Sequence, residues 1–196
     1  MTVNSESGNT DLRLVILLHR VRDDLVRYED PIFAEYGLTT EQYSVLAAMK
    51  YLGGSVRITD LASQLERSPN SVSMLVDRMA KAGLVKRVRD RVDRRVVYVT
   101  ATSKGEDAFR LATPPTWESA RKVLSRLSYG DKRSLIKLLE VVKCTALEYL
   151  NPGVNAAEII KNSITSRADL FDRMVKNVFP STPEAKRQGG KKKKAK

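Results

Sequence analysis

The sequence is poor in the residue types that most metal sites and many catalytic sites need. Its 196 residues include a single cysteine, Cys144, and a single histidine, His19. One cysteine excludes an intramolecular disulfide framework, and the pair matches neither a structural zinc pattern nor a Cys-His nucleophile. P-loop, dinucleotide-binding glycine and His-Glu-x-x-His motifs do not occur. We therefore expect that the protein is not an enzyme and uses no metal and no cofactor.

Long hydrophobic runs are also missing. No run approaches the roughly 18 to 20 apolar residues that span a bilayer. Residues 1–10 are polar and lack the basic and apolar parts of a signal peptide. These absences predict a soluble, cytoplasmic protein that does not bind a membrane. The length suits one domain, or one domain with appendages, and it is sufficient for a hydrophobic core.

What the sequence has in excess is positive charge, unevenly placed. The formal net charge is +12, and residues 186–196 carry seven Lys or Arg and no acid. That tail is either a solvated, disordered end or an added source of attraction to phosphate. A second basic cluster lies inside a segment with strand character, and it consists of Lys86, Arg87, Arg89, Arg91, Arg94 and Arg95, offset by Asp90 and Asp93.

Apolar spacing and capping residues predict the first helices. A three- and four-residue apolar repeat indicates a helix over about 10–36, with a break or kink near Pro31. Thr39 and Gln42 form a capping-box pattern that should begin a second helix, which ends at residues 53–54. Thr59 is the expected N-cap of a short helix that follows a brief extended piece at 57–58.

A longer helix then follows after a tight turn. Ser68 is its expected N-cap, with Pro69 at the first helical position. One stripe is apolar, and Gly83 is a plausible left-handed cap at the other end. The stripe consists of Val72, Leu75, Val76 and Met79. Two helices joined in this way form a helix-turn-helix motif.

Two β-rich runs directly follow that motif. Residues 84–88 and 95–100 are joined by the charged segment 89–94, which predicts a hairpin with a basic tip. A helix-turn-helix followed by such a hairpin is a winged-helix arrangement. The helix can enter a major groove while an arginine at the tip reaches a narrow minor groove, where negative potential is concentrated.

The remaining chain is predicted to be helical up to about residue 180. Ser103 and Glu106 form a second capping-box pattern, and Pro114 with Pro115 should interrupt or end the helix that begins there. A clear helix spans 131–150 and stops at residues 151–153. Apolar stripes near both chain ends suit either a monomer core or an intertwined helical dimer.

The order of these segments resembles the MarR family of bacterial and archaeal transcriptional regulators over residues 10–150. The resemblance rests on 38–46, 59–62, 68–73 with 76–79, 83–85 and, most specifically, on the wing segment 90–95 followed by 99–105. It implies a homodimer held by the first and last helices, with a winged helix in each subunit. Asp93 and Arg95 match the family's Asp-x-Arg element, so that Asp93 would orient the wing and Arg94 or Arg95 would enter the minor groove.

Two positions depart from the family pattern. Met74 stands where many relatives carry a basic residue on the recognition helix, so base readout there would be weaker or apolar. Residues 101–102 read Ala-Thr where Leu-Thr is more usual. Neither departure alters the expected fold.

The expected fold is thus mainly α with a small β-hairpin wing. Residues 10–36 and 103–150 would form the helical dimerisation region, 37–102 the winged helix-turn-helix domain, 151–180 a helical extension and 181–196 a disordered Lys-rich tail. The residues expected to contact DNA are Arg67, Ser68, Pro69, Asn70, Ser71, Ser73, Met74, Arg78, Arg89, Arg91, Asp93, Arg94 and Arg95.

The resemblance further implies a small aromatic or phenolic anion as effector. Candidate residues for its pocket, each with plain packing as the competing role, are Arg13, His19, Arg20, Tyr43, Tyr51 and Trp117. The sequence thus predicts a homodimeric, nucleoid-associated regulator of double-stranded DNA, a repressor released by its effector from a pseudo-palindromic operator. The alternatives are an architectural DNA-coating protein and a protein-interaction adaptor that uses the extension at 154–179.

Overall fold

The computed structural model describes residues 5–90 and 96–160, with side chains from residue 9 onward. Its elements, in chain order, are α1 (Ser5–Ala34), α2 (Thr40–Tyr51), β1 (Ser55–Arg57), α3 (Ile58–Leu65), α4 (Pro69–Lys81), β2 (Val85–Arg89), β3 (Val97–Ala101), α5 (Ser103–Val123), α6 (Tyr129–Leu150) and α7 (Ala156–Ile160). The predictions for the tip of the wing and for residues 161–196 lie outside the described residues.

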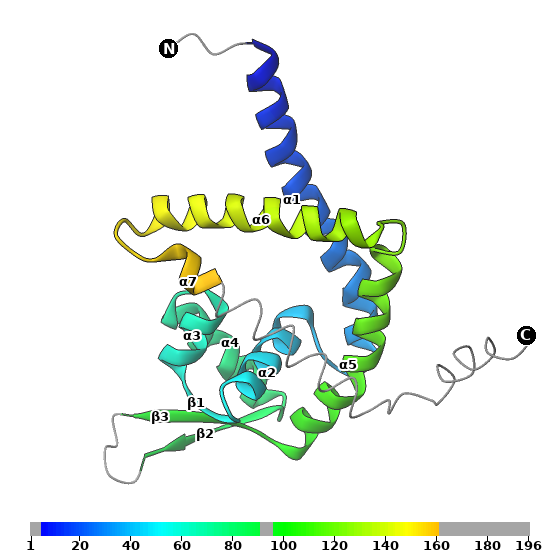
Figure 1. Cartoon of the computed structure of the whole chain (residues 1–196). Helices are drawn as coiled ribbons and strands as arrows, with labels where there is room; N and C mark the ends of the chain where they lie inside the picture. Colours follow the sequence, from blue (N-terminus) through cyan, green and yellow to red (C-terminus); the bar gives the residue numbers. More distant parts are fainter. Residues whose placement is uncertain (1–4, 91–95, 161–196) are drawn as a thin grey trace, which may run out of the picture.

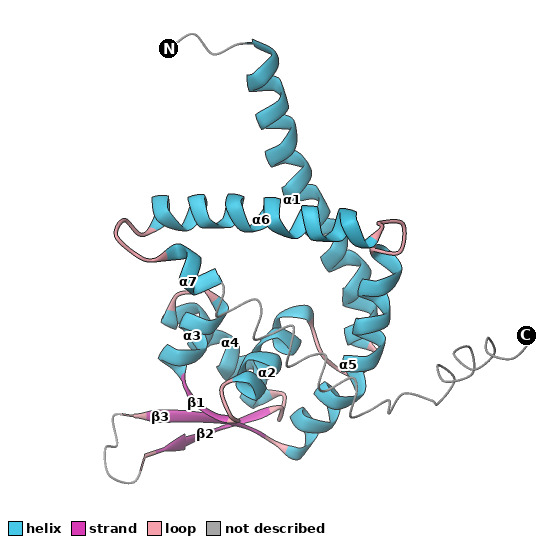
Figure 2. Cartoon of the chain, in the orientation of Figure 1, coloured by secondary structure: helices cyan, strands magenta, loops and turns pink. Residues whose placement is uncertain are grey.

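The elements form a small lobe beside three long helices. Helices α2, α3 and α4 pack together with the sheet, while α5 leads out of β3, contacts α1 and α2, and is followed by α6 (Figure 1). The expected class, mainly helical with a small β wing, is confirmed (Figure 2). In the described residues no helix is both long enough and apolar enough to cross a bilayer.

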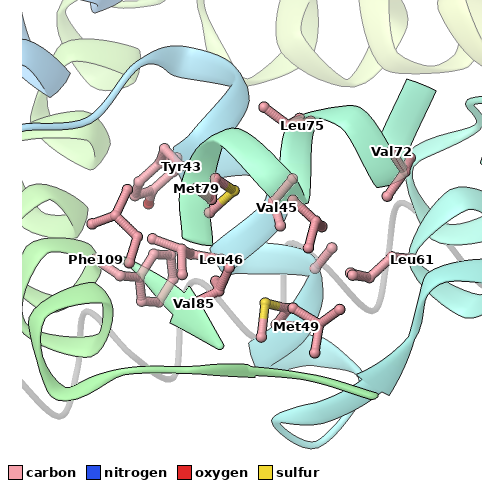
Figure 3. Close-up of a cluster of buried hydrophobic side chains, with 14 of the residues drawn as sticks. Tyr43, Val45, Leu46, Met49, Leu61, Val72, Leu75, Met79, Val85 and Phe109 are labelled. Atoms are coloured by element: carbon pink, nitrogen blue, oxygen red, sulfur yellow. The ribbon is translucent and has the colours of Figure 1, made fainter. Parts of the chain in front are cut away.

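The core of the lobe is formed by the predicted apolar stripes. Val45 on α2 and Val72 and Val76 on α4 are each 0% exposed, and Phe109 from α5 closes one side (Figure 3). Burying a side chain of this size contributes about 1.5–3 kcal/mol. The stripe of α4 is therefore committed to the core, which fixes the side that this helix presents to solvent.

Several local signals work as the sequence indicates. The Thr39 side chain accepts a hydrogen bond from the backbone N–H of Gln42, and the Gln42 side chain accepts one from the N–H of Thr39, so the capping box at α2 is complete. Ser68 caps α4 with Pro69 in its first turn. Gly83 has a φ of +73°, which an L side chain rarely adopts.

Two predicted caps lie elsewhere. The N-cap of α3 is Arg57, which makes no side-chain cap bond, and Thr59 lies inside the helix. The N-cap of α5 is Thr102, whose hydroxyl accepts from the N–H of Gly105 and donates to the carbonyl of Gly83. Thr102 therefore caps α5 and also links its start to the end of α4, a double role that local sequence spacing does not reveal.

The prediction that Pro114 and Pro115 interrupt their helix is wrong, since α5 continues through both prolines. Each proline removes one backbone donor from the helix. The helix has buried residues on both sides of the pair, Phe109, Ala112 and Thr113 before it and Ser119 after it. Neighbouring threonine hydroxyls also donate to backbone carbonyls one turn earlier. Pro31 likewise lies inside α1, which ends at Ala34.

The sheet has three antiparallel strands in the order β1-β3-β2. Val99 on β3 is opposite Val56 on β1 and Arg87 on β2. Residues directly opposite one another share a face, so Arg87 belongs to the face whose neighbours, Val56 and Val99, are buried. The extended piece expected near residue 57 is therefore the third strand of the wing sheet.

The long outer helices leave much apolar surface exposed. No residue of α6 is buried, and Leu138 and Val141 are 65% and 64% exposed. In α1, Leu12, Ile16 and Leu17 are also exposed. Helix α6 begins at Tyr129, with Ser128 and Asp131 forming a capping box at its start.

Candidate nucleic-acid interface

Helix α4 offers one solvent-facing side. At about 100° per residue, the buried positions Val72, Val76 and Met79 centre on one direction. Asn70, Met74 and Lys81 lie roughly opposite and are exposed. A helix held by its apolar stripe in this way can present the opposite side to the groove of a duplex.

The N-terminal end of α4 is built from predicted contact residues. The Ser68 hydroxyl accepts from the Ser71 N–H at 3.2 Å and donates to the Ser71 hydroxyl at 2.9 Å. Pro69 fills the first helical position, where a missing N–H costs nothing. The positive end of the helix dipole thus lies at a surface of small side chains that a phosphate can approach.

The hairpin of β2 and β3 forms the wing next to α4. Lys86 and Arg89 on β2 are exposed, and the Asp90 N–H donates to the carbonyl of Val96 at 2.9 Å, which closes the described end of the hairpin. Arg91, Asp93, Arg94 and Arg95 lie outside the described residues. Their DNA contacts stay predictions.

Arg87 has a different role from its basic neighbours. Its guanidinium donates to the carbonyl and the hydroxyl of Ser73, at 3.1 and 2.9 Å, and pairs with Asp77 at 2.8 Å. This side chain ties β2 to α4 and occupies two groups on the recognition helix. The sequence analysis placed Arg87 in the basic cluster and Ser73 among the DNA contacts. The register of the sheet explains why Arg87 contacts α4 while its basic neighbours on β2 are exposed.

Glu41 is a partner of two predicted contact residues that the sequence reasoning missed. Its carboxylate, on the first turn of α2, lies 2.8 Å from the Arg67 guanidinium and 4.0 Å from that of Arg78. Both arginines are predicted DNA contacts. Their partner is 26 and 37 positions away along the chain, so no local spacing could have indicated the pairing. The carboxylate neutralises part of the positive potential beside the recognition helix.

A second ion pair joins the lobe to the long helices. Lys143 of α6 donates to both carboxylate oxygens of Glu66, at 2.7 and 2.8 Å. Glu66 is the C-cap of α3 and has a φ of +54°, in the left-handed region. The turn between the two helices of the motif is therefore attached directly to α6.

The six residues expected for an effector pocket lie on three helices, α1, α2 and α5. Arg13, His19 and Arg20 are exposed on α1, and Tyr51 and Trp117 are half-buried on α2 and α5.

Tyr43 is part of the core. Its ring stacks on Phe33 with centroids 4.5 Å apart, and its hydroxyl lies 3.2 Å from that of Thr113. Burial is the main reason why the pKa of Tyr43 is raised above its usual value.

A hollow lies instead between α1 and the helix-turn-helix. Its volume is about 560 Å³, and none of those six residues lines it. Its wall combines cationic and apolar groups with the capped start of α2. The charged and apolar groups of this wall include Arg22 and Val26 of α1, Glu41, Arg67, and Leu75 and Arg78 of α4.

The described residues also bear on the expectation that the protein holds no metal and has no reactive cysteine. They contain no group of three His, Cys, Asp or Glu side chains that could hold a metal ion. Cys144 lies 3.5 Å from a Glu148 carboxylate oxygen, and partial burial and that carboxylate raise the pKa of its thiol. A raised pKa disfavours the nucleophilic thiolate.

Two helices joined by a tight turn, followed by a hairpin that pairs with a strand directly before them, define a winged helix-turn-helix domain. Residues 36–96 match the model of the MarR family. The HTH-type transcriptional regulator MgrA of Staphylococcus aureus is 29% identical over 138 residues, which cover 69% of this chain and 90% of MgrA. The HTH-type transcriptional repressor MdtR of Bacillus subtilis is 28% identical over 102 residues, and the match covers 52% of this chain but only 63% of MdtR.

Solved structures agree in fold. The organohalide-sensing regulator RdhR-CbdbA1625, in its 2,4-dichlorophenol-bound form, superposes with a TM-score of 0.71 at 22% identity and covers 78% of this chain and 90% of its own. A mutant of MarR from E. coli complexed with operator DNA gives a TM-score of 0.63 at 21% identity, covering 68% and 96%. Residues 36–96 thus match the MarR family, the chain is similar in sequence to MarR-type transcriptional regulators, and its fold is that of a winged helix-turn-helix protein.

Proposed function

We propose that the protein is a homodimeric, sequence-specific DNA-binding regulator that represses transcription and is released by a small aromatic or phenolic anion. One observation carries the proposal: the apolar stripe of α4 in the core and the Arg87–Asp77 ion pair fix the recognition helix relative to β2 of the wing. Each recognition helix would enter a major groove of a pseudo-palindromic operator, with half-sites about 34–36 Å apart. The wing would contact the flanking backbone or minor groove.

A DNA titration tests this core of the proposal. Fluorescence anisotropy would compare the promoter region of the protein's own gene with a scrambled duplex of the same length and composition, at two salt concentrations. A sequence-specific regulator discriminates by about 10³-fold or more. Near-equal binding with a steep salt dependence would instead support a DNA-coating protein, with attraction to phosphate as the main term.

The wing is tested separately by R94A/R95A. Loss of two arginines that face the duplex should weaken binding sharply, since each removes a charge-assisted contact. The matched control is K122A/R121A on α5, which removes the same charge from a helix outside the winged-helix lobe. Equal losses in both variants would contradict a specific role for the wing.

The exposed apolar faces of α1 and α6 support the homodimer. Contiguous exposed apolar surface on a soluble protein marks an interaction site, and the family resemblance indicates a second copy as its partner. Leu138→Asp should convert the dimer to a monomer in sedimentation analysis, whereas the adjacent Lys137→Ala should not. A monomeric unmodified chain at micromolar concentration would refute the dimer.

The hollow beside α4 supports the release mechanism. Arg22, Arg67 and Arg78 supply cationic groups, while Val26 and Leu75 supply apolar contact for a ring. An anion that binds there would engage two predicted DNA-contacting arginines and shift the population away from the DNA-competent state. Titration of the protein–DNA complex with 2,4-dichlorophenol and with 4-hydroxybenzoate tests this. Release by either that is lost in Arg22→Ala supports the hollow, and release that survives places the effector elsewhere.

A further inference from the structure

Met74 is exposed to solvent, unlike the methionines of the core. The core methionines Met49 and Met79 are 1% and 0% exposed, whereas Met74 is 61% exposed. It is the one large hydrophobic side chain that α4 leaves exposed, and it lies on the side of the helix opposite to the core. Any surface that covers this large apolar group and removes it from water lowers the free energy of the system.

The polar neighbours of Met74 are largely engaged within the chain. Ser71 is bonded to Ser68, Ser73 and Asp77 are bonded to Arg87, and Arg78 faces Glu41. These groups must first break internal contacts before they can read a base. Met74 has no such contact to give up, and its flexible thioether side chain can adapt to an irregular surface.

The major groove of B-DNA presents one apolar group, the C5-methyl of thymine. Resting on the proposed function, we infer that Met74 packs against a thymine methyl group in each half-site of the operator and makes that position specific for thymine. The side chain of Asn70, one helical turn earlier on the same side, makes no hydrogen bond within the described residues. The two residues form a reading face, Asn70–Met74, that combines an amide with an apolar contact.

Replacing thymine with uracil removes only this methyl group. The loss of one buried methyl corresponds to about four-fold in affinity per half-site and about 15-fold for a duplex changed in both half-sites. The reading face therefore predicts a small, positional and additive effect. Contacts to phosphate would be insensitive to the exchange, because the backbone is unchanged.

The experiment starts from an operator selected from a random duplex library with the full-length protein. Each thymine is then replaced in turn by uracil, and the affinities of the unmodified protein, Met74→Ala and Met74→Leu are measured. One symmetry-related thymine pair should show the four-fold and 15-fold losses with the unmodified protein and with Met74→Leu. Met74→Ala should bind the thymine operator more weakly and be indifferent to uracil at that pair. Leu111→Ala, which shortens a comparably exposed side chain on α5, should keep the full uracil effect.

The possible failures are distinguishable. A selected operator without any thymine whose uracil effect disappears in Met74→Ala would overturn the reading by Met74 and leave the proposed function standing. Selection that yields no preferred sequence would overturn the proposed function itself. Because Met74 is exposed, Met74→Ala should keep the melting temperature of the unmodified chain, and Met74→Leu provides the same test with an apolar side chain in place.

Discussion

Replacing Glu41 with glutamine should increase affinity for DNA. The carboxylate of Glu41 is 2.8 Å from the Arg67 guanidinium, and the side chains of the pair are 47% and 42% exposed. The same carboxylate is 4.0 Å from Arg78. A duplex that docks on α4 offers phosphates to arginines that are already partly neutralised. Glutamine keeps the size of the side chain and a hydrogen-bond acceptor but removes the charge.

The size of the effect follows from the exposure of the pair. An exposed ion pair contributes about 0.2–1 kcal/mol, and the half-exposed geometry here keeps the Glu41–Arg67 pair within that range. Transferring that interaction to a phosphate should therefore raise the affinity by about 1.4- to 5-fold per subunit. Each additional phosphate contact should steepen the dependence of log K on log salt by about 0.9. The free energy of unfolding should fall by less than about 1 kcal/mol.

The assay is anisotropy titration over a series of salt concentrations, with Glu118→Gln as the matched control. Glu118 is exposed on α5, and its replacement makes the same change in net charge. Tighter binding with a steeper salt slope in Glu41→Gln alone is the expected result. Weaker binding with a shallower slope would refute the competition argument and show that Glu41 instead holds Arg67 in its productive position.

Three further predictions concern stability. Gly105→Ala should destabilise the fold by at least about 2 kcal/mol, measured by denaturant unfolding, because the new Cβ would overlap the carbonyl oxygen of Leu84. Tyr43→Phe should cost about 1 kcal/mol by removing the hydrogen bond to Thr113, yet leave DNA binding and effector response intact; a changed effector response would return Tyr43 to the pocket. Burial, with a smaller contribution from the neighbouring Asp30, raises the pKa of Glu29, so its charged form opposes folding and stability should decline as the pH rises above about 4.5. Glu29→Gln should flatten that part of the pH–stability curve, and an unchanged curve would contradict the assignment.

Local chemistry predicted much of the DNA-binding lobe. The Thr39–Gln42 box, the Ser68-Pro69 start and the positive φ at Gly83 depend on a few neighbouring residues, and the structure has each of them. The apolar stripe of α4 was readable for the same reason, since a helix repeats every 3.6 residues. From these features the outward side of α4, and hence most candidate contact residues, followed directly.

Non-local contacts could not be read in this way. Two adjacent prolines ordinarily end a helix, but α5 continues through them, with Thr113 buried before the pair and Ser119 buried after it. Arg87 is a basic residue in a basic cluster, as a DNA contact would be. Only the pairing of β2 with β3 shows that it shares the face of buried Val99. The effector-pocket residues stay a prediction for a related reason: they were chosen by type along several helices, and aromatic and basic residues on separate helices need not converge in space.

The candidate interface is, in its described part, a surface of internal ion pairs. Glu41 with Arg67, Asp77 with Arg87 and Glu66 with Lys143 all join separate elements around α4. When DNA binds at such a surface, an arginine gives up its carboxylate partner as it gains a phosphate. The net gain in binding free energy per arginine is therefore smaller than a count of positive charges suggests. The same pairs fix the orientation of the recognition helix before DNA arrives, which lowers the ordering cost of binding. In the proposed regulator, discrimination between sequences would then depend on groups with few internal contacts to give up, and on α4 these groups include Asn70 and Met74.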